Sequence, residues 1–335
     1  MPILRVSIAS VLLALVCAGD VAAQWTVLPS PTAATLRSVD FIDDSTGWVA
    51  GYDGVVRRTV DGGQMWTPQN SGTSVRLLAI NFVDANNGWI NGGLYVARTV
   101  DAGANWISVT IDPSALIFRN RGYPSAANTY WVPAGCGTCM TRWFYRYTID
   151  GLGMSIEQTF DLVGSTAPFL DMHFVDADNG WAVGNAALIR RITAASSAAP
   201  GFAFQTCTSC TGATLNGIFM LDANTGWLVG NTGTIRATTD GGTTWAPQTS
   251  GTLANLRDVH FRDATTGWIV GDSGTILATV NGGANWTPEN STVGVSLFGV
   301  ATTPGVAYAV GGDLATSTNG VALKRTDVLF QDGFE

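Results

Sequence analysis

Four cysteines form two closely spaced pairs, Cys136-Gly-Thr-Cys139 and Cys207-Thr-Ser-Cys210, and a fifth, Cys17, lies near the N-terminus. Two Cys-x-x-Cys pairs can hold zinc through four thiolates. In an oxidising compartment the same cysteines form disulfides instead. The N-terminal segment described below indicates export, so we expect disulfides, with pairing inside each motif, and no metal. A zinc site is the alternative.

Arginine recurs at one position of a repeated pattern. Arg57, Arg190 and Arg236 each follow the Gly of a Trp-x-x-Gly motif by six residues, and Arg146 occupies the same column when counted back from Thr148. Guanidinium groups match carboxylates in a two-pronged geometry. An arc of such arginines could bind an acidic peptide, and these four are the candidate binding residues. The alternative is that each pairs with a nearby Asp on a solvated edge.

Carboxylates and histidines offer little for catalysis. The chain has three Glu, and most Asp residues recur five positions before a Trp, which indicates turn chemistry. His173 and His260 share a position that Asp40, Asn81 and Phe219 fill elsewhere, so we interpret it as a packing position. Nucleophile elbows, phosphate loops and metalloprotease motifs are absent from the sequence. The sequence predicts no catalytic residues and no cofactor.

These side chains must be positioned by a repeated unit. Seven copies of about 42 residues are marked by Gly-Trp pairs or single aromatic residues, which are Trp48, Trp89, Trp131, Trp181, Trp227, Trp268 and Tyr308. Each copy alternates short apolar runs with Gly- and Asp-containing turns, as four antiparallel strands require. Four strands per unit of this length are typical of a propeller blade. The sequence therefore predicts an all-β, seven-bladed β-propeller.

One turn can be predicted almost residue by residue from the sequence. Thr59-Val-Asp-Gly-Gly-Gln-Met-Trp66 is the first of four similar segments, whose Asx residues are Asp61, Asp101, Asp240 and Asn281. A short Asx side chain can bond backbone N–H groups of its own turn, and Gly supplies positive φ. We interpret these segments as Asp-box hairpins, which have a structural role.

The N-terminus supplies a prediction of ring closure. Trp25 precedes Leu36 by 11 residues, the same distance that separates Trp66 from Leu77 in the next unit. Trp25 is therefore in phase with the fourth strand of a blade. We expect it to complete the seventh blade, which would remove the open sheet edges. The propeller would span residues 24–326, followed by a tail of residues 327–335.

The first 23 residues resemble a secretory signal peptide. Arg5 precedes an apolar run from Val6 to Ala18, and small residues end the segment at Ala23. We expect an exported protein, periplasmic or extracellular and soluble after cleavage. A net charge of −8 disfavours nucleic acid as a partner. With 13% charged residues and 12 Trp, the composition also excludes a disordered chain.

The repeats resemble a known family. Gly226-Trp-Leu-Val-Gly-Asn-Thr-Gly-Thr-Ile235 and Gly267-Trp-Ile-Val-Gly-Asp-Ser-Gly-Thr-Ile276, combined with the Asp-boxes, are similar to the photosystem II stability and assembly-factor propellers. The resemblance covers residues 25–325, although the third and fourth units carry inserts and cysteine pairs. It implies a non-enzymatic exported scaffold that binds a protein partner, such as a membrane protein or its acidic segment, through an arginine-rich surface. The arginine column matches that surface only loosely. We expect a monomer.

Two other functions remain open from the sequence. One is a secreted propeller for adhesion or surface recognition. The other is an Asp-box glycosidase of the sialidase type, which needs an arginine triad and a Tyr–Glu pair. No Arg-Ile-Pro segment is found near the N-terminus, and Glu157 is the only plausible interior acid.

Overall fold

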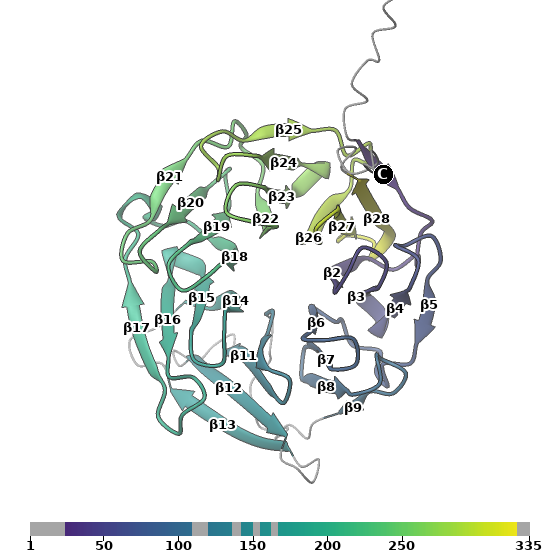
Figure 1. Cartoon of the computed structure of the whole chain (residues 1–335), viewed down its shortest axis with the longest axis horizontal. Helices are drawn as coiled ribbons and strands as arrows, with labels where there is room; N and C mark the ends of the chain where they lie inside the picture. Colours follow the sequence, from purple (N-terminus) through teal and green to yellow (C-terminus); the bar gives the residue numbers. More distant parts are fainter. Residues whose placement is uncertain (1–23, 109–119, 136–141, 150–154, 162–166, 327–335) are drawn as a thin grey trace, which may run out of the picture.

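The computed structural model describes residues 24–108, 120–135, 142–149, 155–161 and 167–326. These residues form seven four-stranded antiparallel sheets arranged as blades around a central axis (Figure 1). The first strand of each blade lies next to the axis and the fourth lies at the rim. The prediction of an all-β, seven-bladed propeller is confirmed.

The blades follow the sequence repeats in order. Blade 1 consists of β2 (Leu36–Phe41), β3 (Gly47–Gly51), β4 (Val56–Thr59) and β5 (Thr67–Gln69). Blade 2 consists of β6 (Ala79–Phe82), β7 (Gly88–Gly92), β8 (Tyr95–Thr99) and β9 (Ile107–Ser108). Blade 3 consists of β10 (Tyr123–Ala126), β11 (Thr129–Gly135), β12 (Arg142–Ile149) and β13 (Ser155–Asp161). Blade 4 consists of β14 (Phe169–Phe174), β15 (Gly180–Gly184), β16 (Ile189–Thr193) and β17 (Gly201–Gln205).

The remaining blades complete the ring. Blade 5 consists of β18 (Leu215–Met220), β19 (Gly226–Gly230), β20 (Ile235–Thr238) and β21 (Ala246–Gln248). Blade 6 consists of β22 (Leu256–Phe261), β23 (Gly267–Gly271), β24 (Ile276–Thr279) and β25 (Thr287–Glu289). Blade 7 consists of β26 (Ser296–Thr302), β27 (Val306–Asp313), β28 (Thr318–Thr326) and β1 (Trp25–Val27). Short 3-10 turns occur at Tyr52–Gly54, Asn185–Ala187, Thr208–Cys210 and Asp272–Gly274.

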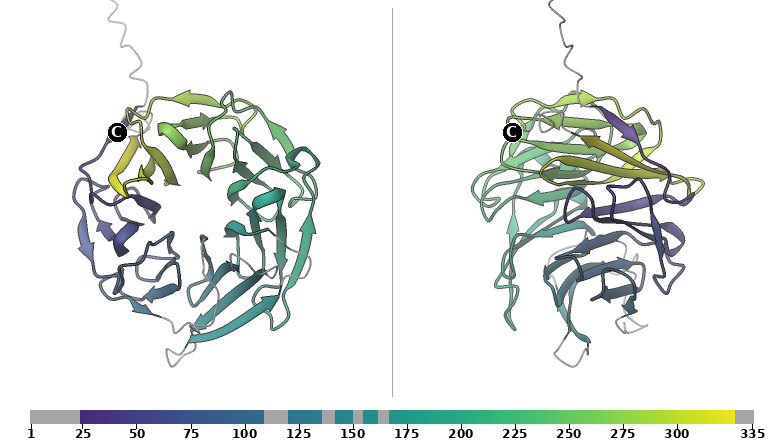
Figure 2. Two further views of the ribbon diagram at one scale, coloured as in Figure 1. Left: turned by 180° about the vertical axis from the view of Figure 1, so that it is seen from behind. Right: turned by 45° about the vertical axis from the view of Figure 1, so that its right-hand side comes forward.

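Ring closure by the N-terminal strand is confirmed. β1 pairs antiparallel with β28, with Trp25 opposite Arg325 and Val27 opposite Leu323. The views in Figure 2 show the purple start of the described chain beside the yellow β28 at the rim of the disc. The first and last parts of the propeller are therefore held in one sheet, and β28 is left without an open edge.

The Gly-Trp pairs have a packing reason. The ring of Phe41 covers Gly47 of the same blade, where an added Cβ would come within 2.4 Å of ring carbons. The other face of Phe41 stacks on Tyr308 of blade 7, with ring centroids 3.6 Å apart. Trp48 stacks in the same way on Phe82 of blade 2, at 3.5 Å. The glycine thus makes room for the ring that the preceding blade packs against.

The two repeated motifs contact each other across the blade boundaries. Trp48 Nε1 donates a hydrogen bond to the Ala102 carbonyl in the Asp-box of blade 2, at 2.9 Å. Trp181 and Trp227 bind the Asp-box carbonyls of the following blades in the same way. These three buried indole N–H groups are thus satisfied by the next blade, as is usual for buried donors.

Inside each Asp-box, the Thr and Asx side chains hydrogen-bond to each other and to backbone amides of the same turn. Thr59 Oγ1 donates to Asp61 Oδ1 at 2.8 Å and accepts from the Gly63 amide at 2.9 Å. The Asp61 carboxylate also accepts from the Met65 amide. At the second position of the turn, Gly62 has φ 68° and its blade 2 equivalent Ala102 has φ 61°. Alanine in the left-handed region is unusual and makes this the more strained copy of the turn.

Within the described residues, no helical segment has the length and apolar character needed to cross a bilayer.

Candidate functional site

The four arginines selected from the sequence do not share one register. Arg57 lies opposite Val49, the residue after the blade Trp, and Arg190 and Arg236 occupy equivalent positions. Arg146 instead lies opposite Trp131 itself. Counting from Thr148 was wrong by one residue, and a one-residue shift moves a side chain to the other face of a strand. Arg146 therefore belongs to a different column.

The other three arginines are held separately by local contacts. Arg57 Nε donates to the Pro31 carbonyl at 3.1 Å, and Arg236 Nε donates to Ser209 Oγ at 2.9 Å. Arg190 packs over the ring of Phe204. These partners are backbone, hydroxyl and ring groups on different loops and outer strands. A binding role for this column stays a prediction, and it is tested below against a second set of arginines.

Arg146 belongs to a column of cations that pack on the blade aromatics. The members, each 4.8 to 5.9 Å from a ring centroid, are Arg58, Arg98, Arg146, Arg191 and Lys324. Arg146 is buried, and its guanidinium donates to Gln158 Oε1 at 2.9 Å and to the Ser197 carbonyl at 2.7 Å. Because its donors are used inside the protein, we assign Arg146 to packing.

The central channel brings together residues from all seven blades. Equivalent positions of the first strands and of the segment before β10 form three stacked rings of seven residues. The arginine mouth is formed by Arg37, Leu78, Asn120, Leu170, Asn216, Arg257 and Phe298. The middle ring is formed by Ser38, Ala79, Arg121, Asp171, Gly217, Asp258 and Gly299. The aromatic mouth, at the other end of the first strands, is formed by Asp40, Asn81, Tyr123, His173, Phe219, His260 and Ala301.

A bulge in the first strand aims the arginine mouth toward the axis. In β2 the pairing with β3 shifts between Leu36 and Ser38, so Arg37 is the extra residue. The same shift occurs at Arg257 in β22. A bulged residue leaves the alternating order of the strand and its side chain is redirected. The bulge places both guanidinium groups beside a cavity of about 210 Å³ that opens at this mouth.

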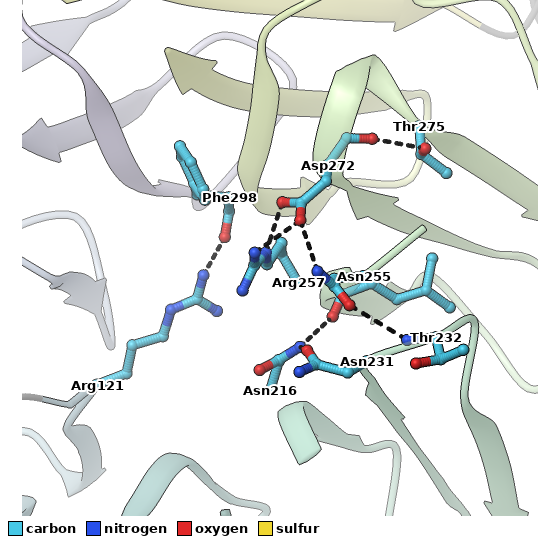
Figure 3. A network of polar contacts seen from close by, with 10 residues as sticks. Arg121, Asn216, Asn231, Thr232, Asn255, Arg257, Asp272, Thr275 and Phe298 are labelled. Atoms are coloured by element: carbon cyan, nitrogen blue, oxygen red, sulfur yellow. Dashed lines mark hydrogen bonds and ion pairs between the residues drawn. The ribbon is translucent and has the colours of Figure 1, made fainter. Parts of the chain in front are cut away.

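Two of the three guanidinium groups at this end of the channel have carboxylate partners. Figure 3 shows one of these pairs, Arg257 with Asp272, and the bond from Arg121 to the Phe298 carbonyl. Arg257 donates to both oxygens of Asp272, at 2.7 Å each. Arg121 points into the cavity from the middle ring and pairs with Asp258 at 2.9 Å. Burial opposes the charge on Arg121, but the Asp258 and Asp171 carboxylates outweigh burial and raise the pKa of the guanidinium. Arg121 is therefore charged, and the ion pairs fix both guanidinium groups in place.

Of the three guanidinium groups, that of Arg37 has the fewest partners for its charge and its N–H groups. Its guanidinium carbon lies 4.2 Å from the ring centroid of Phe298, and its buried Nε has no hydrogen-bond partner among the described residues. Burial, together with the neighbouring Arg121 and Arg257 guanidiniums, lowers the pKa of Arg37 to about 10. A buried donor without a partner is costly, so an anion placed here would gain a charged hydrogen bond.

Sequence reasoning missed the arginine mouth although a signal was present. Arg37 and Arg257 both follow the Leu that begins a unit, at Leu36 and Leu256. The same position holds leucine, phenylalanine or asparagine in the other blades, so the repeat does not mark it as a charged position. Arg121 precedes the third unit, where the repeat is weakest, so its phase could be assigned only from the structure.

Only one of the two cysteine pairs lies within the described residues. The structure joins Cys207 to Cys210, with Cα atoms 5.2 Å apart, and both side chains are buried beside the core of blades 4 and 5. Cys136 and Cys139 lie outside the described residues. Among the described residues, no group of three or more His, Cys, Asp or Glu side chains could hold a metal ion. The disulfides stay a prediction, as do the signal peptide and the C-terminal tail, which also lie outside the described residues.

The histidines line the channel and do not pack inside a blade. The rings of His173 and His260 lie on either side of Phe219, with centroids 4.9 and 4.4 Å from it. Burial lowers the pKa of His173 to about 3 and that of His260 to about 4, so both imidazoles are neutral. The interpretation of this position as a packing slot was incomplete, because it forms the aromatic mouth.

Comparisons with known proteins agree with this fold. Residues 18–116 match the family model described as photosynthesis system II assembly factor YCF48. A solved structure described as YCF48 bound to D1 peptide is similar, with a TM-score of 0.68 and 20% identity, over 91% of this chain and 95% of that chain. YCF48 from Cyanidioschyzon merolae is similar with a TM-score of 0.66 and 20% identity, over 91% of this chain and 99% of that chain. No curated protein matches the sequence. The resemblance to the photosystem II assembly-factor propellers is thus confirmed by the family model across the first two blades, and the shared fold extends over most of the chain.

Proposed function

We propose that this chain is a non-enzymatic, exported protein-binding scaffold that takes up an acidic segment of a protein partner at the arginine mouth. The match to an assembly-factor family model over residues 18–116 supports a role in assembly. A similar propeller has been solved with a peptide of D1 bound to it. For this chain, the corresponding partner is a protein segment that carries carboxylates.

The observation that carries the proposal is the uncompensated guanidinium of Arg37. It lies beside the 210 Å³ cavity together with Arg121 and Arg257. Three guanidiniums around one opening favour a carboxylate, which can accept several charged hydrogen bonds at once. Because Arg121 and Arg257 are already paired with Asp258 and Asp272, they frame the opening rigidly, while Arg37 supplies a charge and an Nε donor without a partner among the described residues.

The channel carboxylates support a structural role over a catalytic one. Asp171 Oδ2 accepts from the Ile218 amide of the next blade at 3.0 Å. Asp258 Oδ2 accepts from the Val300 amide at 3.0 Å, and its Oδ1 pairs with Arg121. Both carboxylates thus join neighbouring first strands. A screen with glycosidase substrates tests the remaining enzymatic alternative, and turnover above background would contradict the scaffold proposal.

Peptide binding tests the arginine mouth directly. The probe is a fluorescent peptide ending in Asp-Glu with a free C-terminal carboxylate, and its amidated, Asn-Gln counterpart is the control. Arg37→Gln should weaken binding by roughly tenfold or more, because a charged hydrogen bond contributes about 1.5–3 kcal/mol. Arg57→Gln is the matched control, because it removes an arginine of the sequence-predicted column outside the channel.

This assay distinguishes the arginine mouth from the arginine column predicted from the sequence. If Arg57→Gln weakens binding and Arg37→Gln does not, the column predicted from the sequence carries the site and the arginine mouth is rejected. Equal binding of the neutral peptide would reject both. Export is tested by the N-terminal residue of the mature protein, expected at Gln24, and the monomer by light scattering.

A further inference from the structure

A second surface, at the aromatic mouth, lies at the opposite end of the channel. Four rings from blades 3, 4, 5 and 6 form a continuous arc, which consists of Tyr123, His173, Phe219 and His260. Successive ring centroids lie 4.4, 4.9 and 4.4 Å apart. Because the rings come from four successive blades, the arc covers about half of the mouth.

A carboxylate faces this arc across the axis. Asp40 belongs to blade 1, which lies opposite blades 4 and 5 in a seven-bladed ring. Its Oδ2 accepts from the Phe82 amide at 2.6 Å, which fixes the side chain at the rim of the cavity. Asn81 and Ala301 complete the mouth beside it. The opening therefore has an aromatic half and an acidic half.

The cavity behind this mouth has room for a ligand and a negative lining. Its volume is about 320 Å³. The lining includes four carboxylates, from Asp40, Asp171, Asp176 and Asp258, against the single guanidinium of Arg121 among the residues that line it. Burial raises the pKa of Asp40 to about 6, so its carboxylate is charged at about pH 8. The two imidazoles are neutral there and add ring faces without positive charge.

We propose that the aromatic mouth binds an alkylammonium group, held between the Asp40 carboxylate and the arc of Tyr123, His173, Phe219 and His260. A cation gains from the negative face of an aromatic ring and from a nearby carboxylate at the same time. An anion would meet the uncompensated carboxylate, and a neutral group would leave it unpaired. The two ends of the channel thus select opposite charges, with carboxylates at the arginine mouth and ammonium groups at the aromatic mouth.

A ligand titration followed by NMR tests this site. The probes are n-butylammonium for a free amine and Nα-acetyl-lysine methylamide for a lysine side chain. The neutral controls are n-butanol and the same lysine derivative acetylated on Nε. Both ammonium probes should bind saturably and compete with each other. Binding by the lysine derivative alone assigns the site to a peptide side chain, and binding by the free amine alone assigns it to a small ligand.

Variants separate the site from the rest of the channel. Asp40→Asn keeps an acceptor for the Phe82 amide and removes the charge, so ammonium affinity should fall by roughly tenfold. Asp53→Asn is the matched control, because Asp53 is exposed and lies outside the cavity. Phe219→Leu keeps an apolar side chain and removes one ring, which should weaken binding by roughly threefold.

Specific outcomes would overturn the proposal. They are equal binding of the neutral controls, no saturable binding of either ammonium probe, or Asp40→Asn and Phe219→Leu proteins that both bind as tightly as the unmodified chain. Should Asp40→Asn fail to fold, Phe219→Leu decides. Arg37→Gln should leave ammonium binding unchanged, so loss of acidic-peptide binding and loss of ammonium binding report separately on the two mouths.

Discussion

Replacing Trp25 with alanine should open the propeller at the seam between its first and last strands. The Trp25 side chain is 2% exposed and packs with Trp268, Val300 and Leu323 across blades 6 and 7. Its Nε1 donates to Glu289 Oε2 at 2.7 Å, and Glu289 also pairs with Arg325 of β28 at 3.1 Å. The substitution removes the ring and the hydrogen bond that hold β1 in place.

The expected loss follows from burial. Truncating a buried Trp to Ala costs about 3–5 kcal/mol of unfolding free energy, from lost transfer energy and the cavity left behind. For a chain of this size that corresponds to a fall in Tm of roughly 5–10 °C. Urea unfolding followed by tryptophan fluorescence measures the free energy, and hydrogen exchange followed by mass spectrometry locates the effect.

Trp286 provides the matched control. It occupies the same fourth-strand phase in blade 6, is 8% exposed, and donates to Gln248 Oε1 at 3.0 Å. Both Trp→Ala variants should lose similar free energy. Only Trp25→Ala should speed exchange throughout β28, because β1 is the outer neighbour of β28 and no hairpin connects it to the other strands of blade 7. Unchanged protection of β28, or a stability loss below about 1 kcal/mol, would refute the closure argument.

Three further predictions follow from individual contacts. Thr238→Val removes the hydroxyl that accepts from the Gly242 amide at 2.8 Å in the blade 5 Asp-box, and should lower the free energy of unfolding in urea by about 1–3 kcal/mol. The control Thr243→Val, at an exposed position of the same turn, should cost much less. Equal losses in the two variants would contradict the Asp-box assignment. Burial raises the pKa of Asp40 from 3.8 to about 6, so the protonated form stabilises the fold at low pH and this stabilisation is lost as the pH rises through 6. The stability of Asp40→Asn relative to the unmodified chain should therefore increase between about pH 4 and about pH 7, and a constant difference would contradict the shift. Finally, thiol labelling under denaturing conditions should find Cys207 and Cys210 protected until a reductant is added, whereas reaction without reductant would exclude the disulfide.

The architecture was predictable because each blade is a local unit. The space that Gly47 leaves for the Phe41 ring and the φ values of the Thr59–Trp66 turn are requirements within one blade, and they explain the residue types found there. Phase counting placed Trp25 in the last blade correctly, because it needed only the distance from Trp25 to Leu36. Phase counting failed at Arg146, where the third unit is longer and a single residue reverses the face.

The sequence alone determined the blade count, the strand order and the ring closure, since these follow from repeated local patterns and from one distance at the N-terminus. Only the tertiary structure decided where charge gathers. Arg37, Arg121 and Arg257 come from three blades and meet because the first strands and the segment before β10 converge on one axis. Asp40 and Phe219 face each other across the other mouth for the same reason. Periodicity records the position of a residue within its blade, whereas proximity across the channel depends on how seven blades close around a common centre.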